Sequence, residues 1–310
     1  MLFGTKDGKA VEIKPLEFNL ERELQNFFEA NMQEITGYVF LKTEYSIDGY
    51  RMDSVAFDNE NNAFIIVEYK RGRNESLVDQ GYSYLNKLLD RKADFVLLYN
   101  EIKNQSKLAK DFEWSQSRIL FVSPKFTKNQ IDATAFTGMA FELYEAKKYQ
   151  NGLYLINPIV QKKINFDEGK VKTKVDSSII DNVNKEIVVY DENTLFGKST
   201  KTTQDLYKEM EEAILQIDSE LVPKFNKLYV GYQFDSKHNI ASIWPKKDWI
   251  EIVLTMKLGT LNDPLGLAYD ISNRLWPAAQ YAVRYDTSKN IDDIIDLVKQ
   301  CYRSLKKKYW

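Results

Sequence analysis

Two strand-like runs separated by a short polar turn constrain this sequence more than any other feature. The runs are Tyr50–Phe57 and Ala63–Tyr69, and the five residues between them, 58–62, are Asp, Asn, Glu, Asn and Asn. A polar cluster of this kind between two apolar runs predicts a turn. The segment from 50 to 69 is therefore expected to fold as an antiparallel β-hairpin.

Charged side chains gather at the open end of this hairpin. A turn centred between residues 60 and 61 places Asp53 opposite Glu68, and opposed residues have Cβ atoms about 5 Å apart. Because strand side chains alternate, Glu68 and Lys70 share one face and Tyr69 takes the other. Two like charges so close destabilise a sheet unless a positive group compensates them. A divalent cation with oxygen ligands, Mg²⁺ or Mn²⁺, would do so; a structural salt-bridge cluster is the alternative interpretation.

The periodicity around the hairpin predicts an α/β domain. Helices are expected at 20–35, with Asn19 as N-cap, and at 76–91. Apolar runs at 94–99 and 118–122 are interpreted as strands, and a second hairpin is expected at 141–149 and 153–159. Strands flanked by helices imply a mixed central sheet.

The length of 310 residues favours two domains. The expected boundaries are 1–160 for the first domain, 161–203 for a linker of mixed charge, and 204–310 for a smaller α+β C-terminal domain. In the last of these we expect a helix ending near 221, strands at 228–234, 240–244 and 249–257, and a final helix at 291–305.

Composition excludes several kinds of site. With one histidine, His238, and one cysteine, Cys301, the chain has no Cys/His zinc site, and carboxylates and lysines must carry most of the chemistry. A net charge of −2 gives no global positive field for nucleic acid, so such a contact needs a local patch. Because no apolar stretch approaches a membrane helix and the start lacks a secretory signal, a soluble, cytoplasmic protein is expected.

Four pieces of residues 15–160, in order, resemble the PD-(D/E)XK nuclease superfamily. The match is closer to one branch, which is similar to the NucS/EndoMS mismatch-nuclease catalytic domain and to uncharacterised bacterial relatives, some labelled predicted transport proteins. The pieces are Glu21-Arg22-Glu23-Leu24-Gln25, Gly49-Tyr50-Arg51-Met52-Asp53, Glu68-Tyr69-Lys70-Arg71, and Asp79-Gln80-Gly81 with Tyr84. The proline of the superfamily name has no counterpart before Asp53, and the N-terminal DNA-binding domain of the archaeal mismatch enzymes is absent, so mismatch specificity is not implied.

The resemblance implies a restriction-endonuclease-like fold and a set of site residues. The implied catalytic residues are Glu21, Asp53, Glu68, Lys70 and Gln80. The implied metal ligands are Asp53, Glu68, the carbonyl of Tyr69, and Glu21 directly or through water. Helical geometry also favours Glu21 over Glu23 as the inward-pointing acid, with Glu23 as the fallback. Periodicity directs Gln80 toward a groove or solvent. Arg51, Arg71 and Arg73 are the candidates for phosphate contacts.

The expected function is therefore that of a magnesium-dependent DNA endonuclease in phage defence or DNA repair, with DNA as partner and a homodimer compatible with the sequence. The alternative is a nucleic-acid-binding or regulatory module with a nuclease fold that does not cut. The transport label of some relatives is the weakest interpretation, since no membrane segment is expected. Residues 262–284 resemble part of a C-terminal domain of unknown function, which implies a boundary and no activity.

Overall fold

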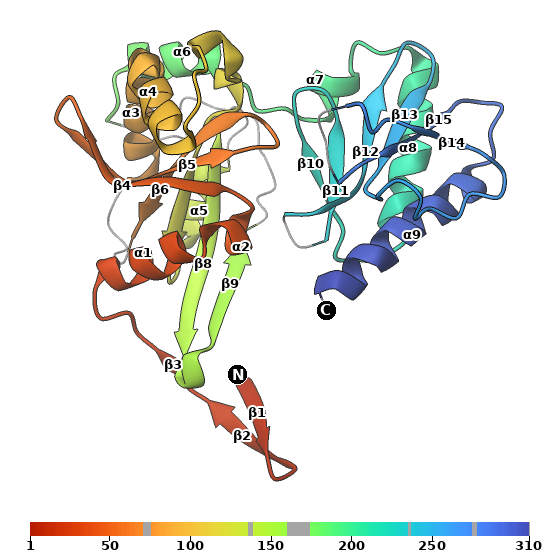
Figure 1. Ribbon diagram of the computed structural model, residues 1–310. Helices are drawn as coiled ribbons and strands as arrows, with labels where there is room; N and C mark the ends of the chain where they lie inside the picture. Colours follow the sequence, from red (N-terminus) through yellow and green to blue (C-terminus); the bar gives the residue numbers. More distant parts are fainter. Residues whose placement is uncertain (71–75, 136–138, 160–173, 235–236, 275–277, 310) are drawn as a thin grey trace. The chain divides into compact units, whose positions relative to one another are not determined.

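The structure, a computed structural model, describes residues 1–70, 76–135, 139–159, 174–234, 237–274 and 278–309 (Figure 1). The chain forms two compact units, residues 1–189 and residues 190–310. No helix in the described ranges is both long enough and apolar enough to cross a membrane.

A seven-stranded mixed sheet forms the centre of the first unit. Its order is β3-β8-β7-β6-β5-β4, with β9 paired to β8. The bounds are β3 (Pro15–Leu16), β4 (Val39–Ile47), β5 (Tyr50–Asp58), β6 (Ala63–Tyr69), β7 (Arg118–Ser123), β8 (Phe141–Tyr149) and β9 (Tyr154–Pro158). The β6–β7 and β7–β8 pairs are parallel and the others antiparallel. Strand β6 is thus where the sheet changes from antiparallel to parallel pairing.

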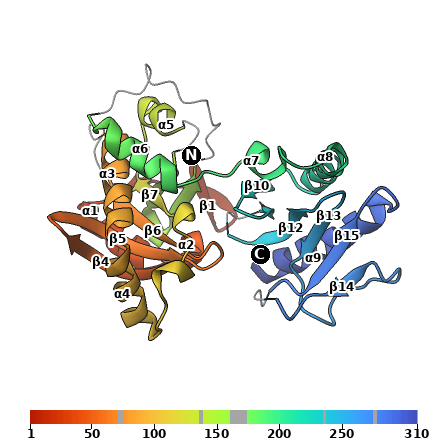
Figure 2. The ribbon, with the colours of Figure 1, turned by 90° about the horizontal axis from the view of Figure 1, so that it is seen from above.

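Helices cover both faces of this sheet (Figures 1 and 2). One face packs on α1 (Glu21–Ala30) and α2 (Met32–Thr36). The other face packs on α3 (Leu77–Asp90), α4 (Lys92–Lys103), α5 (Lys128–Thr134) and α6 (Ser177–Glu186). The two cores take alternate residues of the same strands: Ile65 and Val67 of β6 pack toward α1, and Phe64 and Ile66 pack toward α3 and α4. This alternation explains why every residue of β6 is buried.

The predicted hairpin is confirmed in its turn and its register. Strands β5 and β6 pair from Ser54↔Val67 to Asp58↔Ala63, as a turn centred between residues 60 and 61 requires. Asp58 stabilises the turn, because its Oδ1 accepts the N–H groups of residues 60 and 61 at 2.9 and 3.2 Å. Arg118 of β7, with a side chain 12% exposed, forms an ion pair with the same carboxylate.

Three expectations for this unit are wrong. The run 94–99 lies in α4, where Phe95, Val96, Leu98 and Tyr99 are buried; so short an apolar run has the same pattern in a strand and in a buried helix. The helix expected at 20–35 is interrupted at Asn31, which separates α1 from α2. Its N-cap is Leu20 without a side-chain cap, while the Asn19 N–H donates to Glu23 at 2.8 Å.

The first unit also contains several smaller elements. A separate hairpin of β1 (Leu2–Lys6) and β2 (Lys9–Ile13) precedes β3, and short 3-10 helices occupy Ala109–Asp111, Trp114–Gln116 and Gln150–Gly152. The second predicted hairpin, β8 with β9, is confirmed. Helix α6 lies within the range expected as a linker and contacts α3, where Tyr82 donates to Asn184 at 3.4 Å. Residues 160–173 lie outside the described residues.

The second unit is an antiparallel sheet that packs against helices. Its strand order is β10-β11-β12-β13-β15-β14. The bounds are α7 (Glu192–Phe196), α8 (Lys201–Leu215), β10 (Val222–Phe225), β11 (Val230–Gln233), β12 (Asn239–Pro245), β13 (Ile250–Leu254), β14 (Ala268–Asp270), β15 (Tyr281–Tyr285) and α9 (Ile291–Tyr309). Helices α8 and α9 bury their apolar residues with those of β12, β13 and β15. The predicted fold class, a mixed sheet flanked by helices plus a smaller α+β part, is confirmed.

Candidate active site

The ends of β5 and β6 separate at the position where the acidic residues were predicted. Backbone pairing of the two strands ends at Ser54 and Val67, and two residues further along β6 the Tyr69 N–H donates to Asp53 Oδ2 at 3.0 Å. On its other side β6 stays paired with β7, and the Lys70 N–H donates to the Val122 carbonyl at 2.8 Å. A carboxylate thus takes the place of a backbone acceptor at this point of the sheet.

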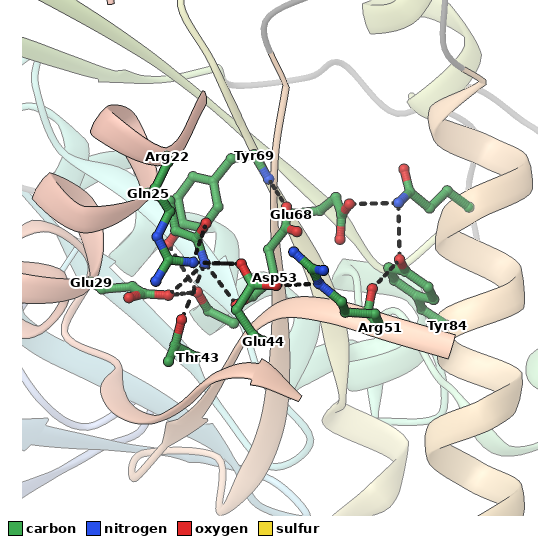
Figure 3. A network of polar contacts seen from close by, with 12 residues as sticks. Arg22, Gln25, Glu29, Thr43, Glu44, Arg51, Asp53, Glu68, Tyr69 and Tyr84 are labelled. Atoms are coloured by element: carbon green, nitrogen blue, oxygen red, sulfur yellow. Dashed lines mark hydrogen bonds and ion pairs between the residues drawn. The ribbon is translucent and has the colours of Figure 1, made fainter. Parts of the chain in front are cut away.

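The structure brings Asp53, Glu68 and Lys70 together. Figure 3 shows the two acids of this group. Glu68 and Lys70 are only 4% and 7% exposed, and Lys70 Nζ lies 3.2 Å from Glu68 Oε1. Glu68 Oε2 is buried and accepts no hydrogen bond from the residues that the structure describes. A buried carboxylate oxygen without a donor is unfavourable, so this site has unused capacity for a positively charged group.

The pKa values of Asp53 and Glu68 also indicate that the site can accept a positive charge. Burial, and then the nearby charge of Asp53, raise the pKa of Glu68 to about 8. Burial also raises the pKa of Asp53, although the Tyr69 N–H and the Lys70 ammonium oppose that change. Both carboxyl groups therefore hold protons more tightly than usual in the absence of a cation. A divalent cation would favour the ionised form of both.

Gln80 reaches the acid pair from α3. Its Nε2 donates to Glu68 Oε1 at 2.6 Å and to the Tyr84 hydroxyl at 3.2 Å, and that hydroxyl donates to the Arg51 carbonyl at 2.8 Å. The sequence placed Gln80 toward a groove or solvent; it is half-buried and faces Glu68. Its neighbour Gly81 lets α3 lie close to the sheet, because a Cβ there would come within 2.5 Å of a ring atom of Phe141.

Helix α1 contributes Gln25, a residue that sequence reasoning missed. Glu21 is exposed in the first turn, and Glu23 forms an ion pair with Lys148 at 2.5 Å. Gln25 is 4% exposed, and its Nε2 lies 3.0 Å from the Asp53 carbonyl and 2.9 Å from Glu29 Oε1. Because residues four apart share a helix face, Glu21 lies on the same side, one turn nearer the end.

A signal for Gln25 was present in the sequence. It lies next to Leu24 and three residues before Phe28, both fully buried, so helical periodicity directs it inward. A polar residue within an apolar stripe usually has buried hydrogen-bond partners. Here one of those partners, Glu29, also accepts from Ser54 Oγ at 2.6 Å.

A third acid, Glu44, was also missed, and it lies beside Asp53. The register Thr43↔Ser54 and Tyr45↔Met52 places Glu44 across from Asp53 on β4. Its Oε1 lies 2.6 Å from Arg22 Nη1 and 3.2 Å from Gln25 Nε2, and its Oε2 pairs with Arg51 (Figure 3). These partners lower the pKa of Glu44 even though burial, the largest single effect, acts to raise it. No motif in the sequence points to this residue.

The predicted phosphate contacts are placed only in part. Arg51, near the start of β5, has a side chain that is 68% exposed. Arg71 and Arg73 lie outside the described residues. Among the described residues, no group of three or more Asp, Glu, His or Cys side chains is arranged to hold a metal ion by itself. A cation here would draw on Asp53, Glu68, a backbone carbonyl and groups from water or substrate, which is a common arrangement for Mg²⁺.

The sequence matches no family model. An uncharacterised protein of Haemophilus influenzae is 36% identical over 305 residues, which cover 97% of this chain and 99% of that protein. The chain belongs to the family of this protein. The relative has no assigned activity, so family membership adds no function to the geometry above.

Two solved structures are similar over part of the chain. One is an EndoMS complex with double-stranded DNA, with 19% identity and a TM-score of 0.24 over 42% of this chain. The other is a repair endonuclease from Pyrococcus abyssi, with 19% identity and a TM-score of 0.21 over 36% of this chain. The matches span 47% and 41% of those two chains, less than half of each. The function of the present chain therefore rests on the chemistry of its own residues.

Proposed function

We propose that this chain is a metal-dependent DNA endonuclease that hydrolyses phosphodiester bonds at Asp53, Glu68 and Lys70. The observation that carries the proposal is the acid pair, in which Glu68 is buried and Asp53 half-buried, with the buried Lys70 beside it. A buried carboxylate with an oxygen that lacks a donor, next to a second, half-buried carboxylate, destabilises a fold. A binding or structural protein has no use for that arrangement, whereas a hydrolase that binds a hard dication does.

The residues present fit Mg²⁺ or Mn²⁺. Asp53, Glu68 and the Tyr69 carbonyl would hold it, since these hard oxygen donors suit such ions. When bound, the cation stabilises negative charge on a phosphoryl group and lowers the pKa of a coordinated water. Glu21 is proposed as an additional acid from α1 that acts through water.

The other side chains have tasks that their contacts support. Lys70, buried and 3.2 Å from Glu68, orients the attacking water or donates to a phosphoryl oxygen. Gln80 donates to Glu68 Oε1 and so fixes the rotamer of that carboxylate, as hydrogen bonds to ligating carboxylates commonly do. The Tyr69 N–H restrains Asp53 in the same way. Each reacting group is therefore held by a neighbour before substrate binds.

A cleavage assay tests the proposal. Plasmid and single-stranded DNA are incubated with the full chain in Mg²⁺, Mn²⁺ or EDTA. Wild type is expected to cut only with metal, and Asp53→Asn and Lys70→Ala are expected to lose activity by about 10²-fold or more. The matched control is Asp132→Asn, which changes an exposed aspartate of α5 and should cut like wild type.

A second measurement separates loss of chemistry from loss of metal. Mg²⁺ should raise the unfolding temperature of wild type and of Asp132→Asn, because it binds the folded state, but not that of Asp53→Asn. DNA binding without cleavage in any metal would favour the non-cleaving module instead. Full activity in Asp53→Asn or Lys70→Ala would refute the assignment. Phage plating on cells that carry the wild-type chain or Asp53→Asn tests the defence role.

A further inference from the structure

Two arginines from different elements converge on one carboxylate next to the acid pair. Arg22 comes from α1 and Arg51 from β5, and both contact Glu44 of β4 (Figure 3). The carboxylate uses both of its oxygens for this, one on each guanidinium. The side chains of Arg22 and Arg51 nevertheless remain 48% and 68% exposed. Each guanidinium carries five N–H donors, so both keep donors available for a further anion.

The backbone is strained at the residue that joins these arginines. Glu44 has φ 50° in the middle of a strand, a conformation that a non-glycine residue adopts at a cost of about 1 kcal/mol or more. The strain interrupts the alternation of β4, since Thr43 contacts Gln25 of α1 while Tyr45 packs on Phe95 of α4 on the opposite layer. It brings the Glu44 carboxylate to both arginines at once. Strain of this kind often accompanies a functional site.

The charges identify the ligand. Two guanidinium groups and one carboxylate leave a net charge of +1 at the edge of a site whose own acids repel an anionic substrate. The register places Glu44 across from Asp53, one strand spacing of about 4.8 Å away. Guanidinium groups bind phosphate through parallel N–H···O bonds. We propose that Arg22 and Arg51, positioned by Glu44, bind a backbone phosphate of the nucleic acid beside the bond that is cut.

This inference rests on the proposed function and specifies how the substrate is held there. Glu44 acts as a positioning residue: it holds the two guanidinium groups in one orientation, with Gln25 Nε2 3.2 Å from its Oε1 and 3.0 Å from the Asp53 carbonyl. Gln25 thereby links Glu44, which positions the two arginines, to the strand that carries Asp53. Arg22 and Arg51 bind the substrate, and Glu44 affects it only through them.

Binding of a fluorescein-labelled DNA duplex, measured by anisotropy in EDTA at several salt concentrations, tests the inference without any cleavage. Arg22→Ala and Arg51→Ala should each weaken binding and reduce the slope of log K against log salt by about 1, the value for one lost phosphate contact. The matched control is Arg91→Ala, which removes an arginine whose side chain is 41% exposed and pairs with Asp48 and Asp94, and it should leave the slope unchanged.

Glu44→Gln distinguishes positioning from simple charge neutralisation. If Glu44 only cancelled positive charge, the variant would bind DNA more tightly and cut at least as fast. Positioning instead predicts that affinity does not rise, whereas kcat in Mg²⁺ falls about tenfold or more with little change in KM. Wild-type affinity and slope in both arginine variants, or tighter binding by Glu44→Gln with unchanged kcat, would overturn the inference while leaving the nuclease intact. If wild type neither binds nor cuts DNA, the proposed function itself fails and the inference fails with it.

Discussion

The acid pair makes a specific prediction about stability and pH in the absence of metal. The pKa of Glu68 is about 8 in the folded chain against 4.5 for an ordinary glutamate. Below pH 4.5 the group is protonated in both the folded and the unfolded state, and it has no effect on stability. As pH rises from 4.5 to 8 the unfolded chain releases this proton first, so the folded state loses stability progressively. At about 1.4 kcal/mol per pKa unit the full loss is about 5 kcal/mol.

Removing the neighbouring charge should recover part of that loss. Two unit charges about 5 Å apart interact by about 3 kcal/mol at an effective dielectric constant of about 20. Asp53→Asn keeps an oxygen for the Tyr69 N–H and eliminates this repulsion. We therefore expect the variant to be about 2 to 3 kcal/mol more stable than wild type at pH 8.5, and nearly equal to it below pH 4.5.

Urea unfolding in EDTA at pH 4.3 and pH 8.5 measures the difference. Unfolding is monitored by proteolysis and mass spectrometry, so that peptides from residues 1–189 report the stability of the first unit alone. Asp132→Asn controls for the general effect of removing a negative charge at alkaline pH. The reasoning is refuted if Asp53→Asn gains no more stability between the two pH values than this control does.

Three further outcomes follow from other contacts in the first unit. Gln25→Ala should destabilise the first unit by about 2 to 3 kcal/mol in urea unfolding, because it removes a buried donor from part-buried acceptors, whereas Glu21→Ala at its exposed site should change it by less than about 0.5 kcal/mol. Gly81→Ala should lower the thermal unfolding temperature, equivalent to about 1 to 3 kcal/mol, despite the better helix propensity of alanine, because the added methyl would lie 2.5 Å from an aromatic ring. Arg118→Met should cost about 3 to 5 kcal/mol in urea, since it leaves Asp58 buried without its cation; the double variant with Asp58→Asn should recover much of this.

The sequence determined the centre of the site well, and the reason is local. A two-residue period and a polar turn fix the register of one hairpin, and with it the relation of Asp53 to Glu68. The direction of Lys70 follows from the same alternation. These features involve residues within about one hairpin of each other, where pattern and geometry are directly linked.

The surroundings of the site depend on long-range packing, which pattern alone does not encode. Gln25 meets Asp53 because α1 crosses the strand at that point, and Glu44 meets two arginines because the backbone of β4 turns at a strained residue. The run 94–99 failed for a related reason: four buried apolar residues in six satisfy a strand or a buried helix equally. Only the rest of the fold decides between them.

The change from antiparallel to parallel pairing at β6 has a consequence for how the chain matures. Asp53 and Glu68 belong to one hairpin, which can close quickly because its ends are near in sequence. The main chain of Lys70 is anchored by Val122 of β7, a contact that requires a much longer loop to close. A nascent chain that has emerged only as far as residue 117 can therefore assemble its acids but cannot secure its lysine. The candidate active site is therefore completed late in folding, after the parallel half of the sheet has formed.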